Sequence, residues 1–463
     1  MIYPIEPAFT PEQLARITSG ELRGAMYREP VSSLSIDSRE QNPAGLFLCI
    51  AGERFDGHDY IADAAKNGAI CVITERDAPT NGLCEIRVHS TERALGDIAA
   101  ACLRQKKAQV VAVTGSVGKT TTKQFLAAVI SQHYRTHCTK GNFNNQIGVP
   151  LTVLDIRPEH EAAVLELGMN HSGEIARLSE IVHPHIGIIT NIGNSHIEYL
   201  GSREGIRDAK MEITTGMGRD DILILNGDEP LLAGVEGAVY VALDDPTAQY
   251  RVCSVELKTD SAVFSLHCPD RVLEGLTIPV TGRHCVFDAA FACVAGLLMG
   301  IEEEEIRRGL LSFANTGMRQ NITEENGVTL IEDCYNASPE SMRAAIDVLH
   351  SLTQAHGGRA IAILGDMREL GEHAPELHRA VGCYLAQQDV SVLFTFGEDA
   401  VMIAVGAMES GLPEDSIYVF RCTDDTAQIG NTLRRVVQAG DTVLLKASRA
   451  LEMERLLPYL KTK

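Results

Sequence analysis

Apolar and polar positions alternate along the chain in blocks, with short apolar runs followed by stretches of helical length. Residues 110–114 (VVAVT), 162–168 (AAVLELG) and 186–193 (IGIITNIG) are apolar runs about as long as a β-strand. Residues 124–130 (QFLAAVI) follow the first run and have the length of a short helix. Buried strands that alternate with helices are typical of a parallel sheet covered on both faces. The pattern therefore predicts an α/β fold.

The block pattern breaks twice, and it predicts three domains at residues 1–107, 108–315 and 316–463. A length of 463 residues fits this number, because a domain usually holds roughly 100–200 residues. We expect a small α/β domain first, then a parallel sheet with a β-rich region at residues 237–280, then a Rossmann-like α/β domain.

The same pattern predicts individual elements. In the first segment we expect helices over residues 11–22 and 60–67, strands over 45–50 and 69–74, and a strand with a polar loop over 32–39. In the central segment we expect helices over residues 203–213 and 287–300, and in the third segment strands over 328–333, 360–364, 392–396 and 442–445. Ser338 is expected to cap a helix whose first turn holds Pro339.

The turn after the first buried strand has the composition of a phosphate-binding loop. Gly115 and Gly118 permit positive φ and close approach of the backbone, and the helix that follows offers free N–H groups to an anion. Lys119 adds a positive charge for the phosphates, and the Thr120 hydroxyl can bind Mg²⁺. The strict motif would place Gly at Val113, so an ordinary strand–turn–helix connection with a chance Lys-Thr is the alternative.

Polar side chains stand where the later strands end, which is the edge that binds ligands in open α/β sheets. Glu166 ends the strand at residues 162–168, and such a carboxylate is a suitable Mg²⁺ ligand or a simple turn residue. His196 follows the strand at residues 186–193 and either reaches the same metal or is an ordinary polar residue. Asn144 and Asn145 lie in an amide-rich loop that can bind phosphate or peptide oxygens.

Composition excludes several classes of function. A formal net charge of −21 disfavours a nucleic-acid surface, because such binding depends on Lys and Arg meeting phosphates. The 12 cysteines form no C-x-x-C pair, which argues against a zinc ribbon or a dithiol redox site. No window approaches the roughly 20 apolar residues of a membrane span, and the N-terminus does not resemble an export signal. We therefore expect a cytoplasmic protein.

Several blocks together resemble the Mur ligase family, the ATP-dependent amide-bond ligases of bacterial cell-wall synthesis. The shortened phosphate loop is typical of that family, and the resemblance runs over residues 30–455. The blocks are TGSVGKTTT (114–122), GNFNNQIGVP (141–150), ELGMNH (166–171), NIGNSH (191–196), GRH (282–284), DCYNA (333–337) and LGDMRELG (364–371).

The resemblance implies a role for each matching residue. Lys119, Glu166, His196 and Lys210 would be catalytic, and Lys210 matches a lysine that members carbamylate into a carboxylate-like metal ligand. Metal ligands for Mg²⁺, expected as two ions, would be Thr120, Glu166, His196 and Lys210. ATP would contact Gly115, Ser116, Val117, Gly118, Lys119, Thr120, Thr121, Arg319 and Asp333, and substrates would contact Ser38, Arg39, Asn144, Asn145 and Asn336.

The last two blocks resemble the family members that act in peptidoglycan precursor synthesis by joining D-alanyl-D-alanine to UDP-N-acetylmuramoyl-tripeptide through an acyl phosphate. The resemblance implies that the first domain holds UDP, the second ATP and the third the dipeptide, in a protein expected to be a monomer. Some positions depart from the family pattern. Cys285 and Asp288 stand where amides usually lie near adenine, and Ser338 replaces an Asn, so side-chain contacts there are in doubt.

Three alternatives remain at this stage. The sister ligase that adds a diamino acid should carry an Asp-Asn-Pro-Arg-like stretch, whereas residues 366–369 read DMRE. A folate-polyglutamate ligase should lack the N-terminal domain. A non-catalytic nucleotide-binding scaffold would not need the intact set of Lys119, Thr120, Glu166 and His196.

Overall fold

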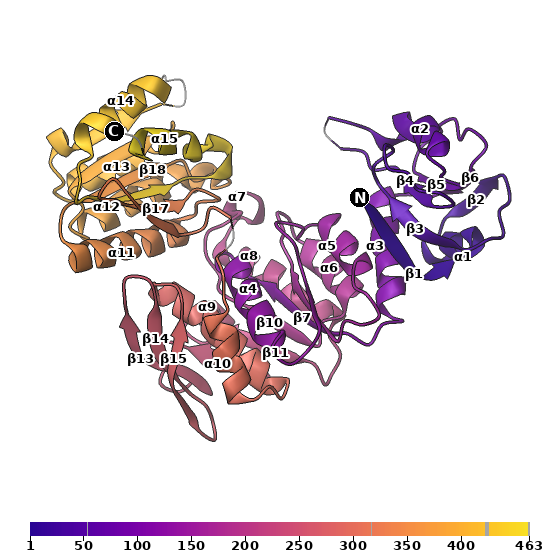
Figure 1. The fold of residues 1–463 in the computed structure, drawn as a ribbon, viewed down its shortest axis with the longest axis horizontal. Coiled ribbons are helices and arrows are strands. Elements are labelled where there is room, and N and C mark those ends of the chain that lie inside the picture. Colours follow the sequence, from indigo (N-terminus) through magenta and orange to yellow (C-terminus); the bar gives the residue numbers. More distant parts are fainter. Residues whose placement is uncertain (53, 316, 422–425, 462–463) are drawn as a thin grey trace. The chain divides into compact units, whose positions relative to one another are not determined.

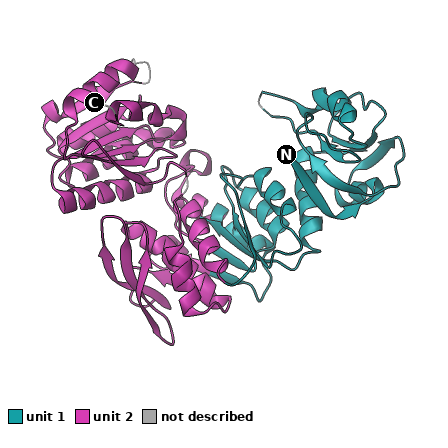
Figure 2. Ribbon diagram, in the orientation of Figure 1, with its two compact units in different colours: residues 1–114, 133–188, 209–223 teal, residues 115–132, 189–208, 224–463 magenta. Residues whose placement is uncertain are grey.

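The computed structural model describes residues 1–52, 54–315, 317–421 and 426–461. The chain divides into two compact units, drawn in separate colours in Figure 2. The first unit holds residues 1–114, 133–188 and 209–223, and the second holds residues 115–132, 189–208 and 224–463. The predicted boundary between residues 315 and 316 falls on residue 316, which lies outside the described residues, and the three predicted domain ranges stay a prediction.

The first unit begins with a six-stranded sheet in the order β1-β3-β4-β5-β6-β2 (Figure 1). Strands β3, β4, β5 and β6 run parallel, while β1 and β2 pair antiparallel at the two edges. The strands are β1 Ile2–Phe9, β2 Glu21–Gly24, β3 Val31–Ser35, β4 Leu46–Leu48, β5 Cys71–Thr74 and β6 Cys84–Arg87, and the helices are α1 Pro11–Ile17, α2 Ile61–Lys66 and α3 Thr91–Leu103.

The rest of the first unit holds strands in the order β10-β7-β9-β8, which belong to a nine-stranded sheet. Strands β7 and β8 both pair parallel with β9, as the apolar runs predicted. The elements are β7 Gln109–Thr114, β8 Thr136–Cys138, β9 Ala162–Glu166, β10 Ile186–Ile189, α5 Gly148–Leu154 and α6 Glu174–Val182. All residues of β9 are buried, which explains its almost continuous apolar sequence.

The second unit contains the remaining strands of that sheet, in the order β15-β14-β13-β12-β11. Strands β13, β14 and β15 pair antiparallel, which confirms the β-rich region predicted at residues 237–280. The helix that follows the phosphate turn, α4, packs against α9 and α10. The elements are α4 Lys119–Ile130, α7 Ile197–Leu200, α8 Arg203–Met211, β11 Ile222–Asn226, β12 Val239–Ala242, β13 Tyr250–Leu257, β14 Ala262–His267, β15 Val272–Ile278, α9 Arg283–Leu298 and α10 Glu303–Leu311. The last three residues of α8 and the first two of β11 belong to the first unit.

The C-terminal part of the second unit is a six-stranded sheet in the order β16-β17-β21-β18-β19-β20. All strands except β16 run parallel, and a cluster of buried apolar side chains from β17, β18, β19 and β21 forms the core. The elements are β16 Asn321–Glu325, β17 Val328–Asp333, β18 Ala360–Gly365, β19 Val392–Phe396, β20 Ile417–Phe420, β21 Thr442–Lys446, α11 Pro339–His356, α12 Ala374–Ala386, α13 Val401–Glu409, α14 Thr426–Val436 and α15 Leu457–Lys461.

Buried parallel strands were predicted well, and short edge elements were not. The four strands predicted in the third segment are present, and the Ser338 hydroxyl caps α11 with Pro339 in its first turn. The helix predicted over residues 11–22 is wrong after Ile17, because Ser19 has a positive φ of 51° and a new strand starts at Glu21. Strand β2 at the sheet edge is polar and largely exposed, so it gives little apolar signal.

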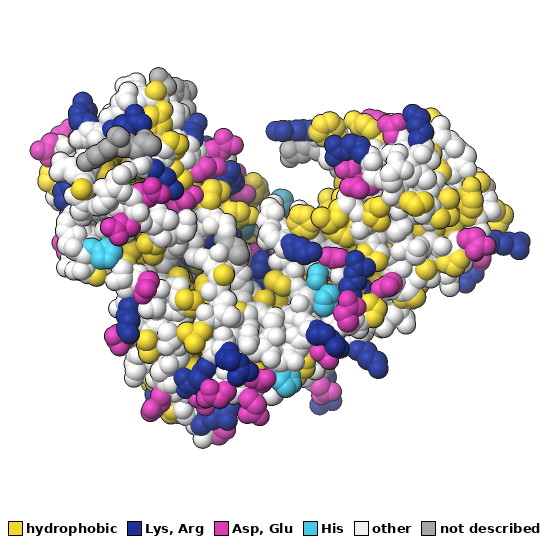
Figure 3. All heavy atoms as spheres, in the orientation of Figure 1, with side chains coloured by type: hydrophobic (Ala, Val, Ile, Leu, Met, Phe, Trp, Pro, Cys, Tyr) yellow, Lys and Arg dark blue, Asp and Glu magenta, His cyan; other side chains and the backbone are white. Residues whose placement is uncertain are grey.

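The described residues include no helix long and apolar enough to cross a membrane. On the face drawn in Figure 3, Lys and Arg side chains are interspersed with Asp and Glu side chains.

Candidate active site

The turn between β7 and α4 requires glycine at two positions. Gly115 has a φ of 152°, and a Cβ added there would lie 1.9 Å from the Thr190 hydroxyl oxygen. Gly118 has a φ of 82°, and its Cβ would lie 2.5 Å from a carboxyl oxygen of Asp288. Positive φ and lack of space act together, so the backbone passes close to its neighbours in a way that a side chain would prevent.

Residues after β10 hold the phosphate turn in shape. The Asn191 side-chain oxygen accepts hydrogen bonds from the backbone N–H groups of Ser116 and Val117, at 3.1 and 3.0 Å. The Thr190 hydroxyl donates to the Val117 carbonyl oxygen at 2.6 Å. Gly193 N–H donates to the Ser116 hydroxyl oxygen at 2.8 Å. The turn is thus fixed from outside the motif by the loop at residues 190–193.

Lys119 begins α4 and lies over the turn. Its Nζ donates to the carbonyl oxygens of Gly115 and Ser116, at 2.8 and 3.3 Å. Thr120, the next residue, is buried in the first turn of this 12-residue helix. A lysine and a hydroxyl at a helix N-terminus can bind an anion and its metal ion, so the geometry supports the predicted phosphate site.

Asp288 lies under the turn, where the family pattern has an amide. Its carboxyl oxygen accepts a hydrogen bond from the Thr122 hydroxyl at 3.0 Å. Burial raises the pKa of Asp288 to about 8, an effect that the Thr122 hydrogen bond only partly offsets. The carboxyl group is therefore mostly protonated at neutral pH and acts as a neutral group in α9. Burial also raises the pKa of the Cys285 thiol, which makes it unreactive.

Glu166 and its amide neighbour lie together in the first unit. Glu166 ends β9 with 2% of its surface exposed, and its carboxylate accepts a hydrogen bond from the Asn144 side chain at 2.8 Å. The Asn145 side-chain oxygen accepts from Gly148 N–H at 2.8 Å and so helps to begin α5. The two predicted substrate amides therefore have different local roles: Asn144 orients a carboxylate, and Asn145 holds the backbone at the first residue of α5.

Lys210 lies at the end of α8 with 1% of its surface exposed. Lys210 is therefore not a solvated lysine on an exposed helix face. Ser38 is buried, and its carbonyl oxygen accepts from the Asn67 side chain at 2.7 Å. Arg39 is exposed and pairs with Asp37 at 2.6 Å, which lowers the pKa of Asp37 to about 2.

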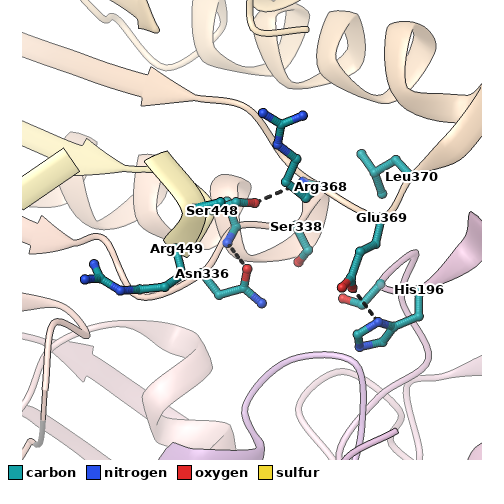
Figure 4. A pocket seen from close by; sticks show the side chains of 11 residues that line it. His196, Asn336, Ser338, Arg368, Glu369, Leu370, Ser448 and Arg449 are labelled. Carbon is teal, nitrogen blue, oxygen red and sulfur yellow. Dashed lines mark hydrogen bonds and ion pairs between the residues drawn. The ribbon is translucent and has the colours of Figure 1, made fainter. Parts of the chain in front are cut away.

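The second unit contains a cavity of about 290 Å³ that His196 lines from the loop after β10. His196 Nδ1 lies 2.6 Å from a carboxylate oxygen of Glu369, as Figure 4 shows. This contact lowers the pKa of Glu369, and the charge of Lys119 lowers it further. The lining residues are Ser195, His196, Asn336, Ala337, Ser338, Arg368, Glu369, Leu370, Ser448, Arg449 and Ala450.

Next to this cavity, Asp333 at the end of β17 forms an ion pair with the buried Lys446, and the Asp333 side chain is itself 18% exposed. Lys446 Nζ donates to Asp333 Oδ2 at 2.6 Å and to the Asn336 carbonyl oxygen at 3.0 Å. The Arg319 guanidinium lies 4.3 Å from the centre of the Tyr335 ring, a cation–π contact. The two hydrogen bonds of Lys446 fix the backbone from Asp333 to Asn336, and this segment leads into the cavity.

Sequence reasoning missed Lys446, Glu369 and Asn191 as parts of the site. Lys446 ends the apolar strand β21, and Glu369 follows β18, so both obey the same strand-end rule that selected Glu166. Applying that rule to every parallel strand would have found them. Asn191 lies in a block noted for its resemblance, but nothing in the sequence says that its amide holds the turn.

The predicted metal ligands are divided between the two units. Thr120 and His196 belong to the second unit, whereas Glu166 and Lys210 belong to the first. Among the described residues, no group of three or more His, Cys, Asp and Glu side chains converges. Hydroxyl and carboxylate oxygens nevertheless fit Mg²⁺, which usually binds one or two carboxylates and completes its shell with water and phosphate oxygens.

Three family models match the chain in sequence order. They describe the catalytic domain of the Mur ligase family (residues 30–134), the Mur ligase middle domain (residues 113–296) and the Mur ligase glutamate ligase domain (residues 318–449). A Bacillus subtilis relative, named UDP-N-acetylmuramoyl-tripeptide–D-alanyl-D-alanine ligase, is 37% identical over 456 residues, which cover 97% of this chain and 98% of that protein.

Two solved structures also match this chain over most of its length. A crystal structure of MurF from Acinetobacter baumannii matches with a TM-score of 0.90 and 31% identity, over 98% of this chain and 99% of that one. A crystal structure of MurF ligase from Thermotoga maritima in complex with ADP matches with a TM-score of 0.81 and 28% identity, over 92% and 96% of the two chains.

Proposed function

We propose, from the premise that this chain belongs to the Mur ligase family, that it is an ATP-dependent ligase which joins D-alanyl-D-alanine to UDP-N-acetylmuramoyl-tripeptide. The observation that carries the proposal is full-length similarity to relatives named for this reaction, on a chain whose phosphate turn keeps its glycines and its lysine. The product would be a peptidoglycan precursor, and the reaction would take place in the cytosol, which supplies ATP.

The reaction needs a carboxylate to become an electrophile. An oxygen of the tripeptide carboxylate attacks the γ-phosphorus of ATP, and ADP leaves. The amine of D-alanyl-D-alanine then attacks the carbonyl carbon of the acyl phosphate, loses a proton and expels inorganic phosphate. Lys119 and the N–H groups of the turn would stabilise the charge on the transferring phosphoryl group. The positioning of three reactants supplies much of the remaining acceleration.

Thr120, Glu166, His196 and Lys210 are the residues that would hold Mg²⁺, which neutralises phosphate charge when bound. Carbamylation of Lys210, by addition of CO₂ to its neutral amine with loss of a proton, would turn this buried side chain into a carboxylate-like metal ligand. Arg319 and Asp333 would approach the nucleotide, with the Lys446 ion pair fixing Asp333.

The substrates would be distributed along the chain. Ser38 and Arg39 would contact the UDP end, and Asn144, Asn145 and Asn336 the phosphates and peptide. The cavity lined by Asn336, Ser338 and Ser448 would take the dipeptide, because it combines hydroxyl and amide groups with apolar surface. No partner chain is required by this scheme, and we expect a monomer.

The experiment is release of phosphate from ATP with defined substrates. We expect release only when UDP-N-acetylmuramoyl-tripeptide and D-alanyl-D-alanine are both present, together with formation of the pentapeptide product by mass spectrometry. Release driven by a free diamino acid and the UDP-dipeptide would assign the chain to the sister ligase. ATP binding without any release would favour the scaffold alternative. Supplying tripeptides that end in lysine or in diaminopimelate would define the third residue.

A further inference from the structure

Two buried cysteines stand opposite each other on neighbouring strands of the first sheet. Cys71 is the first residue of β5, Cys84 is the first residue of β6, and the two are register partners in this parallel pair (Figure 1). Both are free cysteines, and both are 0% exposed. The sequence argues against a dithiol site because it has no C-x-x-C motif, but the fold brings together two cysteines from different strands.

The register places the two thiols within reach of a disulfide bond. Neighbouring strands lie about 4.8 Å apart, and disulfides usually join residues whose Cα atoms are about 4.4–6.8 Å apart. Register partners also carry their side chains on the same face of a sheet. A hydrogen bond between the two side chains raises the pKa of Cys71 and lowers the pKa of Cys84. A bond between the two sulfur atoms therefore needs little movement of either strand.

The two cysteines differ in how easily a small molecule can reach them. In the sheet order β4-β5-β6-β2, Cys71 belongs to an interior strand, whereas the strand of Cys84 is followed only by the edge strand β2. The register partner of Cys84 in β2 is Gly24, which has no side chain, and three of the four residues of β2 are exposed. Short exposed edge strands are among the first elements to open locally, so opening of β2 uncovers Cys84 before Cys71.

We propose that Cys71 and Cys84 form a reversible disulfide, which makes them a redox-responsive modification site in the first unit. The oxidant is a small disulfide such as oxidised glutathione. The Cys84 thiolate attacks one sulfur of the oxidant and releases the other half as a thiolate, which leaves a mixed disulfide on Cys84. The Cys71 thiolate then attacks the Cys84 sulfur and releases the second half. The two protein thiols lose two electrons and two protons, and the oxidant becomes two thiols.

The position of the bond indicates what it does. It links the beginnings of β5 and β6, whereas the loop with Ser38 and Arg39 follows the end of β3. Strands β3, β4, β5 and β6 run parallel, so the bond and this loop lie at opposite edges of the sheet. A crosslink between the strands restricts the unfolded chain and thereby stabilises the folded one. Oxidation therefore stabilises the first unit and leaves the loop proposed to contact UDP unchanged.

The direct test is treatment of the full chain with oxidised glutathione, followed by mass spectrometry of unreduced peptides. In the native protein we expect peptides linked through Cys71 and Cys84, and separation of these peptides by dithiothreitol. In Cys71→Ser we expect Cys84 to keep the mixed disulfide with glutathione, and in Cys84→Ser neither product. Cys49→Ser is the control, because Cys49 is equally buried in the same sheet but its N–H bonds to the Ile73 carbonyl oxygen, away from both thiols.

The native protein alone decides whether the bond forms, so the result does not depend on the folding of any variant. Absence of the linked peptides after exposure to oxidised glutathione would overturn the proposal. Thermal unfolding should shift upward by several degrees on oxidation of the native protein and of Cys49→Ser, but not of Cys84→Ser. Loss of phosphate release on oxidation that Cys84→Ser prevents would contradict the stabilising role. A protein that forms the bond but never ligates would overturn the proposed function and not this inference.

Discussion

The phosphate turn and the cavity around His196 are two parts of one unit, and they are built in opposite ways. The turn at residues 115–120 is continuous in sequence, and its shape depends on backbone conformation and on hydrogen bonds from residues 190–193. The cavity takes its lining from four separate segments, residues 195–196, 336–338, 368–370 and 448–450. Contacts between side chains of different segments, such as the 2.6 Å approach of His196 Nδ1 to Glu369, bring these segments together.

This difference shows which kind of binding depends on a short motif and which depends on the tertiary fold. Anion binding by backbone N–H groups needs only a short motif with glycine at defined positions, so it can be predicted from sequence. Recognition of a small substrate needs side chains that only the tertiary fold brings together. We therefore expect substitutions in the turn to affect nucleotide chemistry most, and substitutions around the cavity to affect either stability or the second step.

The largest effect on activity should come from the turn. We expect Lys119→Ala to lower the rate of ligation at least about 100- to 1,000-fold, the loss typical when one group that stabilises transition-state charge is removed. The measurement is steady-state phosphate release with saturating substrates. Lys107→Ala is the matched control, since Lys107 is exposed and should leave the rate unchanged. Equal rates for the two variants would contradict a phosphate role for Lys119.

Next to the cavity, the largest effect should be on stability. Lys446→Ala would leave Asp333 without its buried partner, and we expect a loss of about 3–5 kcal/mol in the free energy of unfolding. Lys461→Ala removes a surface pair with Glu325 at 3.5 Å and should cost at most about 1 kcal/mol. Denaturant titration measures both. Similar losses for the two variants would contradict a larger contribution of the Lys446–Asp333 pair to the free energy of unfolding.

The pH dependence of stability tests Asp288 beneath the turn. Its folded-state pKa of about 8 lies above the unfolded value of about 3.9, so the folded protein binds this proton more tightly. Its contribution to stability is therefore greatest below about pH 4, falls as pH rises, and levels off above about pH 8. Asp288→Asn restores the amide of the family pattern and does not titrate, so its stability relative to the native protein should rise by about 3–4 kcal/mol from pH 5 to pH 8. A constant difference across that range would refute the raised pKa.

The smallest of these effects should come from Gly115→Ala. The added Cβ would meet the Thr190 hydroxyl, which can rotate away only by losing its hydrogen bond to the Val117 carbonyl oxygen, so we expect a cost of about 1–3 kcal/mol and weaker ATP binding. Gly141→Ala is the control, because Gly141 also has a positive φ of 52° but has no atom within 4 Å of an added Cβ. Calorimetric titration with ATP separates the two: only the Gly115 variant should lose affinity.

The turn and the buried strands could be predicted because their signals are local. A β-branched run marks β7, an apolar run marks β19, and the Ser338–Pro339 pair marks the start of α11. The edge strand β2 escaped prediction because exposed strands do not need apolar residues. The early end of α1 depended on Ser19, whose positive φ no sequence pattern indicates.

The partners of the site residues could not be predicted, because they are set by tertiary contacts. Lys446 ends β21 and Glu369 lies in the loop after β18, and only the tertiary fold brings them beside Asn336 and His196, respectively. The burial of Lys210 and Asp288 likewise depends on the tertiary fold. The family resemblance assigns an expected role to each residue separately, whereas the structure shows which residues contact one another.

The most direct test of the account follows one oxygen atom. If the tripeptide carboxylate is activated by phosphorylation, a carboxylate labelled with oxygen-18 must lose one of its two oxygens to the released phosphate when the amide forms. We predict one labelled oxygen in each phosphate molecule and one in each product carbonyl, by mass spectrometry. Unlabelled phosphate released alongside the amide product would contradict the acyl-phosphate mechanism and the role given to the turn.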